Sequence, residues 1–281
     1  MKHKHKHKHK HKNKELIRGH TGRHENPLIS VVTVVYNSEK YIERTINSVL
    51  NQTYDNIEYI VIDGGSSDGT VDIIRRYESF IDCWVTEKDS GIYNAMNKGI
   101  SLCTGSFIGL INSGDSYVPN AIEEAVKYIR LMPTLDILFG DMYVVDEFSG
   151  LKRYASAKIE RISEDMSINH PTCFVKRDIY CNKRFDEIFQ VAADYEFVLY
   201  NYLEKKNFFN MGMVVANMNR GGFSSNNPLT IKERFVIHEK YYSKSHAYIN
   251  WLKCLTKIFV RDLLSKLLPV CVMDYIKGYR R

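Results

Sequence analysis

The chain has 281 residues, of which 44% are hydrophobic and 26% are charged, and its formal net charge is +6. This length supplies core-forming residues for one large domain, or for one domain with an appendage. No run of 18 or more apolar residues occurs, so we predict no transmembrane helix.

The opening stretch, MKHKHKHKHKHK, alternates lysine and histidine and cannot build a core. We interpret it as a metal-affinity tag, and the alternative is a natural basic arm that binds polyanions. Residues 1–12 carry six lysines, so without them the formal charge falls from +6 to 0. The charge balance therefore predicts no nucleic-acid partner.

The six cysteines are scattered and form no C-x-x-C pair. We expect reduced thiols of a cytosolic protein and no zinc site.

From residue 28 onward, apolar β-branched runs alternate with segments of helical periodicity. The predicted strands are LISVVTVVY, IEYIVID, CWVTE and FIGLI; the predicted helices run from Ser38 to about Asn51, from Asp68 to about Tyr77, and over SGIYNAMNKGISLC. Ser38 and Asp68 are the expected N-caps. This rhythm predicts βαβ units and a parallel sheet, with ligands bound beyond the carboxyl ends of the strands.

The pattern becomes less regular after Pro119. A helix to about Leu131 is followed by one or two strands in LDILFGDMYVVD, a helix in VAADYEFVLYNYLEK, a strand in MGMVVANM and the loop NRGGFSSNNP. Helical pattern dominates from Leu229 to Arg281. We therefore divide the chain into a tag and leader (1–27), a main domain (28–228, with halves 28–118 and 119–228) and a helical region (229–281).

The first strand ends in Tyr36-Asn37-Ser38 rather than in G-x-G-x-x-G, which argues against a dinucleotide-binding dehydrogenase. Polar turns instead follow several strands. They read VIDGGSSDGT, EKDSGIYNAMNKGI and GLINSGD, and AADYEF comes later. Together with SVVTVVYN, these motifs occur in order over roughly residues 28–225.

This set of motifs resembles family 2 glycosyltransferases, in particular the bacterial enzymes that extend O-antigen or capsule repeat units. The resemblance implies a GT-A fold: an α/β, Rossmann-like, mostly parallel sheet flanked by helices, here with a C-terminal helical extension. It also implies inverting transfer of a sugar from a UDP-sugar to a saccharide on an undecaprenyl diphosphate carrier.

The resemblance further assigns residues to the nucleotide sugar, and Asp63 is expected to accept the uracil N3–H. The expected contacts are Val34, Val35, Tyr36, Asp63, Asp89, Asn97, Lys98, Asn112 and Ser113. Some have simpler explanations: Tyr36 as a core aromatic, Asp63 as a turn cap, and Lys98 as a solvated helix residue. Many relatives have a second acid where this chain has Gly64.

The acidic turn of the family usually reads Asp-x-Asp-Asp and binds Mn²⁺ or Mg²⁺. Here Asn112 and Gly114 replace two of the acids, and Asp115 remains. We predict Asp115 as a metal ligand, because phosphate and water can complete the coordination of a hard cation. An ordinary Asx turn is the alternative.

Asp194 is predicted to be the catalytic base that accepts the proton of the acceptor hydroxyl. A helix-terminal acid favoured by the helix dipole is the alternative. His170 and Arg220 are predicted to contact the acceptor or a diphosphate, although a structural histidine and a surface arginine explain them equally well.

The segment from Trp251 to Leu268 is amphipathic, with Lys253, Lys257 and Arg261 at four-residue spacing. We expect this helix either to lie on an anionic membrane surface or to pack on the protein body. The predicted location is the cytosolic face of the bacterial plasma membrane. The sequence does not decide between a monomer and a homo-oligomer. Two other functions remain: a sugar nucleotidyltransferase and a non-catalytic sugar-nucleotide-binding subunit.

Overall fold

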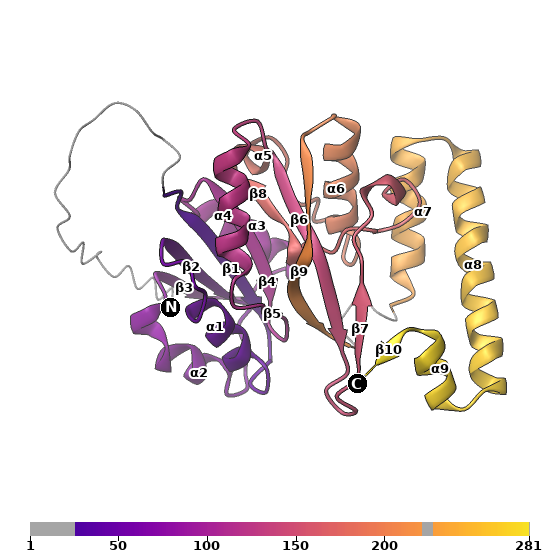
Figure 1. Ribbon diagram of the computed structural model, residues 1–281, viewed down its shortest axis with the longest axis horizontal. Coiled ribbons are helices and arrows are strands. Elements are labelled where there is room, and N and C mark those ends of the chain that lie inside the picture. The colour runs from indigo at the N-terminus through magenta and orange to yellow at the C-terminus, as the bar shows by residue number, and fades with distance from the viewer. Residues whose placement is uncertain (1–25, 221–226, 281) are drawn as a thin grey trace.

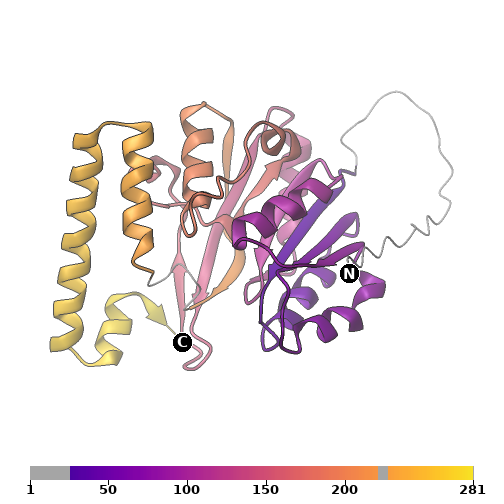
Figure 2. The ribbon, with the colours of Figure 1, turned by 180° about the vertical axis from the view of Figure 1, so that it is seen from behind.

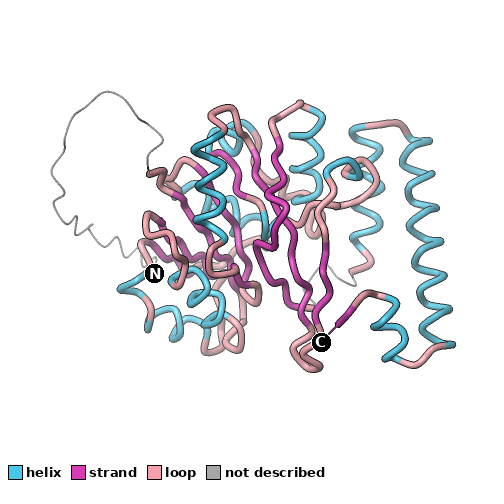
Figure 3. The backbone as a smooth tube through the Cα atoms, in the orientation of Figure 1, coloured by secondary structure: helices cyan, strands magenta, loops and turns pink. Residues whose placement is uncertain are grey.

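The computed structural model describes residues 26–220 and 227–280. These residues form a ten-stranded sheet with helices on both faces (Figures 1 and 3). The strands are β1 (Ile29–Val35), β2 (Ile57–Asp63), β3 (Cys83–Thr86), β4 (Phe107–Asn112), β5 (Ser116–Tyr117), β6 (Ile137–Val145), β7 (Lys152–Ala155), β8 (Phe174–Lys176), β9 (Phe208–Asn219) and β10 (Tyr279–Arg280).

The sheet has a parallel half and a mixed half. Its order is β10-β7-β6-β8-β4-β1-β2-β3, and the strands β4, β1, β2 and β3 pair in parallel. Strand β8 runs antiparallel to both β4 and β6, whereas β9 pairs in parallel with β6 and antiparallel with β5. The expectation of a mostly parallel sheet therefore holds for the N-terminal half. In the other half, the short connection between β6 and β7 permits only antiparallel pairing.

Helices cover both faces of the sheet. They are α1 (Ile42–Leu50), α2 (Thr70–Arg76), α3 (Ile92–Leu102), α4 (Ala121–Leu131), α5 (Arg177–Asn182), α6 (Ala193–Leu203), α7 (Leu229–Tyr241), α8 (Lys244–Leu267) and α9 (Val270–Ile276). Alternate residues of β1 point to opposite faces, so Val31 packs with α1 and α4, and Val32 with α3 and α6. Helix α4 lies toward the viewer in Figure 1, and α3 in Figure 2.

The predicted elements from residue 28 to residue 131 are confirmed, with small differences at the caps. Helix α1 begins at Ile42 and not after Ser38, because the Ser38 hydroxyl is 2.7 Å from the Ser113 hydroxyl and caps nothing. The N-cap of α2 is Gly69, one residue after the expected Asp68, although Asp68 Oδ1 accepts the N–H of Thr70, the first residue of α2, at 3.0 Å.

The C-terminal region is helical as expected, but it ends in β10, which the sequence did not predict. Strand β10 pairs with β7 at the edge of the sheet. Helices α7 and α8 stand side by side at the end of the molecule away from β3 (Figure 1). None of the helices in the described ranges is long and apolar enough to cross a membrane.

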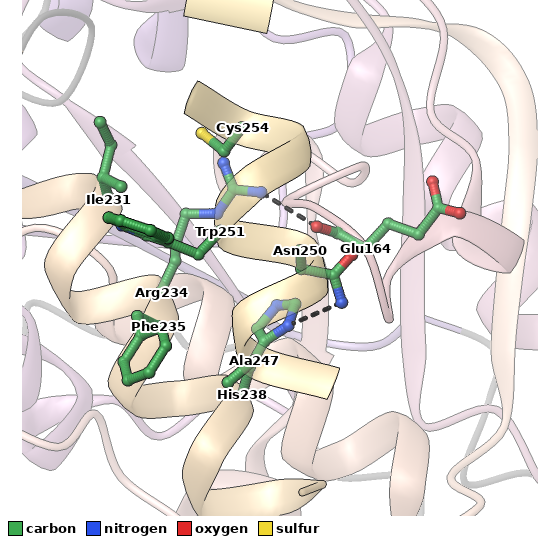
Figure 4. A pocket seen from close by; sticks show the side chains of 9 residues that line it. All are labelled: Glu164, Ile231, Arg234, Phe235, His238, Ala247, Asn250, Trp251 and Cys254. Carbon is green, nitrogen blue, oxygen red and sulfur yellow. Dashed lines mark hydrogen bonds between the residues drawn. The ribbon is translucent and has the colours of Figure 1, made fainter. Parts of the chain in front are cut away.

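Polar groups join α7 to α8 (Figure 4). Nε2 of His238 lies 2.8 Å from the Tyr195 hydroxyl, and the amide of Asn250 lies 3.2 Å from its Nδ1. Burial lowers the pKa of His238 to about 4, so the ring is neutral at physiological pH. The small cavity here, lined also by Arg234, Trp251 and Glu164, is part of a helix–helix interface.

Candidate active site

The parallel strands end at one level, which brings their following loops together. In the register of the sheet, Val35 of β1 pairs with Asp63 of β2, which pairs with Thr86 of β3, while Val34 pairs with Asn112 of β4. The turns that follow β1 to β4 therefore lie at one edge of the sheet, as parallel pairing predicts.

The end of β1 organises the two neighbouring loops through its backbone. The carbonyl of Val35 accepts the N–H of Gly64 at 2.9 Å, and the carbonyl of Val34 accepts that of Ser113 at 3.0 Å. Both valines are buried, so their side chains belong to the core. Tyr36 is 64% exposed, which overturns the core-aromatic explanation and leaves its ring free to meet a ligand.

Asp63 is fully buried, and its carboxylate is occupied by its own loop. Its oxygens accept the backbone N–H groups of Gly65 and Ser66, the Ser66 hydroxyl at 2.5 Å and the Thr86 hydroxyl at 2.5 Å. A carboxylate with four donors and no exposed surface cannot also accept the uracil N3–H. The expected base contact is therefore corrected: Asp63 holds the turn that carries Gly64 and Gly65.

The carboxylate that reaches the surface beside this turn is that of Asp89. A Cβ added at Gly64 would lie 2.5 Å from Asp89 Oδ2 and 3.4 Å from Cδ2 of Tyr36. Asp89 thus fills the space that a side chain at position 64 would take. Gly64 lets the Asp89 carboxylate stand next to the Tyr36 ring, so an acid is present here although the second acid of the family turn is absent.

The turn that follows β4 keeps one acid of the family's acidic turn, Asp115. Asp115 is 7% exposed, and its Oδ1 accepts the N–H of Asn219 at 3.2 Å. Burial raises the pKa of Asp115 to about 7. Oδ1 of Asn112 is buried without a hydrogen-bond partner among the described residues. Gly114 has φ +102, where an aspartate would be strained, so the second acid of the family turn does not suit this backbone.

The predicted base, Asp194, lies in the first turn of α6 with its carboxylate partly exposed. Oδ1 accepts the Tyr93 hydroxyl at 3.0 Å and the N–H of Tyr195 at 2.9 Å. Oδ2 lies 3.9 Å from Nδ1 of His170. Tyr93 lies in α3, which begins three residues after Asp89. Its hydrogen bond to Asp194 therefore connects the predicted base to the helix that follows Asp89.

His170 lies beside Asp194, and its predicted contact with the acceptor stays a prediction. Its Nε2 is buried and has no hydrogen-bond partner within the described ranges. Burial lowers the pKa of His170, against the opposing effect of the Asp194 carboxylate. A neutral imidazole with an unused nitrogen can donate to, or accept from, a substrate hydroxyl.

Three other predicted residues already have protein partners. Asn97 binds the backbone of Phe185 through both ends of its amide. Lys98 pairs with Glu87 at 3.1 Å. Arg220 pairs with Asp146 at 2.5 Å and with Asp274 at 3.2 Å, and its guanidinium lies 4.6 Å from the Tyr279 ring centroid. These contacts tie loops together, and for Arg220 they join the end of β9 to the C-terminal segment. Gly221 to Ser224, the rest of that predicted loop, lie outside the described residues.

Two residues not singled out from the sequence hold the candidate base, Asp194, and the start of its helix in place. One is Tyr93. The other is Glu233 of α7, whose carboxylate accepts the N–H groups of Gln190, Val191 and Ala192 just before α6, at 2.7–2.9 Å. Neither could be found from spacing, because Tyr93 is 101 positions from Asp194 along the chain.

The sheet and its loops have the arrangement of a GT-A glycosyltransferase. The sequence profile described as glycosyl transferase family 2 matches residues 30–185, and the chain belongs to this family. Among solved structures, Staphylococcus aureus TarS residues 1–349 in complex with UDP-GlcNAc superposes with a TM-score of 0.63 at 20% identity, over 89% of this chain and 78% of that one.

Curated relatives agree with this assignment. An uncharacterized glycosyltransferase of Methanocaldococcus jannaschii is 28% identical over 63% of this chain and 65% of its own length. Chondroitin synthase of Escherichia coli is 28% identical over 62% of this chain. The match spans only 26% of the length of the synthase. It therefore supports the family of this chain and does not identify its substrates.

Proposed function

We propose that this glycosyltransferase moves a sugar, with inversion, from a UDP-sugar to a saccharide linked to a lipid diphosphate, in the synthesis of a bacterial surface polysaccharide. The observation that carries the proposal is the linkage of Asp194 through Tyr93 to the helix that follows Asp89. This linkage supports a role for Asp194 as a base beside the edge of the sheet where the donor is expected. Support for the donor class comes from the similarity to TarS, and support for polysaccharide synthesis from chondroitin synthase.

The proposed reaction needs one proton transfer and one displacement. Asp194 takes the proton of the acceptor hydroxyl as its oxygen bonds to the anomeric carbon, while the bond from that carbon to the diphosphate breaks and UDP leaves with the electron pair. Attack from the face opposite the diphosphate inverts the anomeric configuration. Oδ1 of Asp194 accepts hydrogen bonds from the Tyr93 hydroxyl and the Tyr195 N–H, which fix the carboxylate in one orientation. Oδ2 of Asp194 is then the oxygen that faces the substrate.

The turn after β4 offers two oxygen ligands for Mn²⁺ or Mg²⁺, which we propose as the cofactor. Within residues 26–220 and 227–280, Asn112 Oδ1 is an acceptor without a partner, and the Asp115 carboxylate accepts one hydrogen bond. These oxygens fit a hard cation whose other ligands are phosphate and water. No cluster of three or more His, Cys, Asp or Glu that could hold a metal occurs in the described ranges. When bound, the cation would offset the charge that develops on the leaving diphosphate.

The metal proposal predicts that Asp115→Asn uncouples the cation from the nucleotide. In the unchanged protein, Mn²⁺ should tighten UDP binding at least about tenfold, about 1.4 kcal/mol. In the variant, calorimetric titration should give the same dissociation constant with and without Mn²⁺. Ser116→Ala, the next residue along, serves as the control and should retain the response. An equal response to Mn²⁺ in Asp115→Asn would show that Asp115 is only a turn residue.

Helix α8 is proposed to rest on an anionic membrane surface. Its large apolar side chains Phe259, Leu263 and Leu267 are 46–69% exposed, and basic residues lie on the same helix. Exposed apolar and basic side chains on one helix are typical of an interfacial helix.

Replacing Phe259 and Leu263 together by glutamate should abolish co-sedimentation with vesicles that contain phosphatidylglycerol, because both apolar area and favourable charge are lost. Phe80→Glu is a matched control, since Phe80 is 64% exposed but lies far along the chain beside α2. If the double variant sediments like the control, α8 is not the membrane contact.

The substrates are identified by offering a panel of UDP-sugars with a GlcNAc- or GalNAc-diphosphate-lipid analogue and measuring the mass of the product. We expect one sugar to be added, and UDP to be released only when acceptor is present. Binding of UDP-sugar without any transfer would favour a non-catalytic binding subunit. Exchange of the nucleotide with diphosphate would indicate a nucleotidyltransferase.

A further inference from the structure

A groove of about 720 Å³ runs between α8 and α9, and none of its lining residues belongs to the candidate active site. Apolar side chains from both helices line it: Ile249, Leu252, Val260, Leu264, Met273 and Ile276. Along α8 these residues span 15 positions, or about 22 Å at 1.5 Å per residue. The volume is in the range of ligand-binding clefts of about 300–1,000 Å³.

The charges around this groove all have one sign. Lys253, Lys257 and Arg261 on α8 and Lys277 after α9 line it, and none of its eleven lining residues is acidic. Within the described part of the chain, none of these four side chains has a partner in an ion pair or a hydrogen bond, whereas Lys266 on the same helix pairs with Asp262 at 2.9 Å. Four cations without partners beside an apolar groove are complementary to an anion attached to an apolar chain.

We propose that the α8–α9 groove binds the lipid part of the acceptor: a single isoprenoid chain in the apolar groove, with its diphosphate held by Lys253, Lys257 and Arg261. This inference rests on the proposed function and adds a second binding site to it. A flat bilayer contacts only the outward sides of the two helices. Side chains that face each other across the groove are reached only by a molecule that enters it, and a lone chain can do so. Binding there would keep the saccharide end of the acceptor close to the protein while the donor site is filled.

The probe for this site is farnesyl diphosphate, a soluble single isoprenoid chain with a diphosphate. Binding is measured by calorimetry in the presence of saturating UDP, so that the donor site cannot take the probe. The unchanged protein should bind farnesyl diphosphate, and should bind farnesol and inorganic diphosphate each at least about tenfold more weakly, because each lacks one half of the recognised chemistry.

Two variants locate the site. Lys257→Glu with Arg261→Glu should weaken farnesyl diphosphate binding at least about tenfold, and Thr256→Trp should do so by filling the groove. Lys266→Glu, a charge change of the same kind on the same helix outside the groove, should leave binding within about twofold. All variants should retain UDP binding, which separates this inference from the proposed function.

Equal farnesyl diphosphate binding in all variants would overturn the proposal, as would a protein that binds phosphatidylglycerol vesicles but not the probe. In the second case the groove would only be part of the bilayer contact. If the unchanged protein does not bind UDP, the proposed donor site is contradicted, whatever the groove binds.

Discussion

Asp194→Asn should lower the turnover number about 10²–10⁴-fold while UDP affinity remains unchanged. The amide keeps the shape of the side chain and can still accept hydrogen bonds from Tyr93 and Tyr195. It cannot accept a proton at neutral pH, so the rate loss is that of a general base, equivalent to about 3–5 kcal/mol of transition-state stabilisation. The measurement is acceptor-dependent release of UDP, together with a calorimetric dissociation constant for UDP.

Asp72→Asn is the matched control, because Asp72 is likewise an acid in the first turn of a helix and is highly exposed. If Asp194 only favours the positive end of α6, both variants should lose the same small stability, about 0.3–1 kcal/mol, and neither should lose turnover. Full activity in Asp194→Asn would remove the base from the mechanism.

Asp63→Ala should destabilise the fold by about 3–5 kcal/mol. The change leaves the N–H groups of Gly65 and Ser66 and the hydroxyls of Ser66 and Thr86 without their acceptor, and each orphaned donor costs about 1–3 kcal/mol, lessened where water enters. Urea unfolding should show the loss as a lower midpoint.

Asp89→Ala separates structural support from ligand contact. Asp89 is partly exposed, and among the described residues its carboxylate accepts one hydrogen bond, from the N–H of Gly91. We expect a stability change within about 0.5 kcal/mol but at least about tenfold weaker UDP binding. The opposite pattern, a stable Asp63→Ala protein that no longer binds UDP and an Asp89→Ala protein that binds it normally, would restore the original assignment of the base to Asp63.

Much of the fold could be predicted from residues 28 to 131 because the local signals agree there. Strands such as ISVVTVV consist mostly of apolar, β-branched residues, as is typical of a strand buried on both faces, and the helices between them have one apolar side. The order of these elements then predicts parallel pairing, and parallel pairing places the loop ends together. The convergence of Val34, Asp63 and Asn112 follows from this register alone.

The mixed half of the sheet was less predictable because its pairing depends on distant segments. Strand β9 pairs with β6 across a register shift, and β10 completes the edge from the far end of the chain. Two-residue strands such as β10 carry no periodicity, so only the coordinates identify them.

The site was predicted in its residue types but not in its division of roles. In the sequence, Asp63 and Asp89 are both acids at loops that follow strands, and the uracil contact is assigned to Asp63. Burial distinguishes them. The Asp63 carboxylate is buried and accepts hydrogen bonds from four donors, whereas the Asp89 carboxylate lies against Gly64 beside Tyr36. In the same way, the sequence placed Asp194 on a helix but could not show that Tyr93 and Glu233 fix its position, because these contacts are tertiary.

The most direct test of the central claim is a crystal structure of the complex with a UDP-sugar. We expect UDP to lie along the carboxyl ends of β1, β2 and β4, with the nucleotide against Tyr36 and Asp89. The anomeric carbon should lie about 6 Å from Asp194, the sum of a hydrogen bond and a near-attack distance. A nucleotide bound elsewhere, or an anomeric carbon more than about 10 Å from the Asp194 carboxylate, would contradict the account.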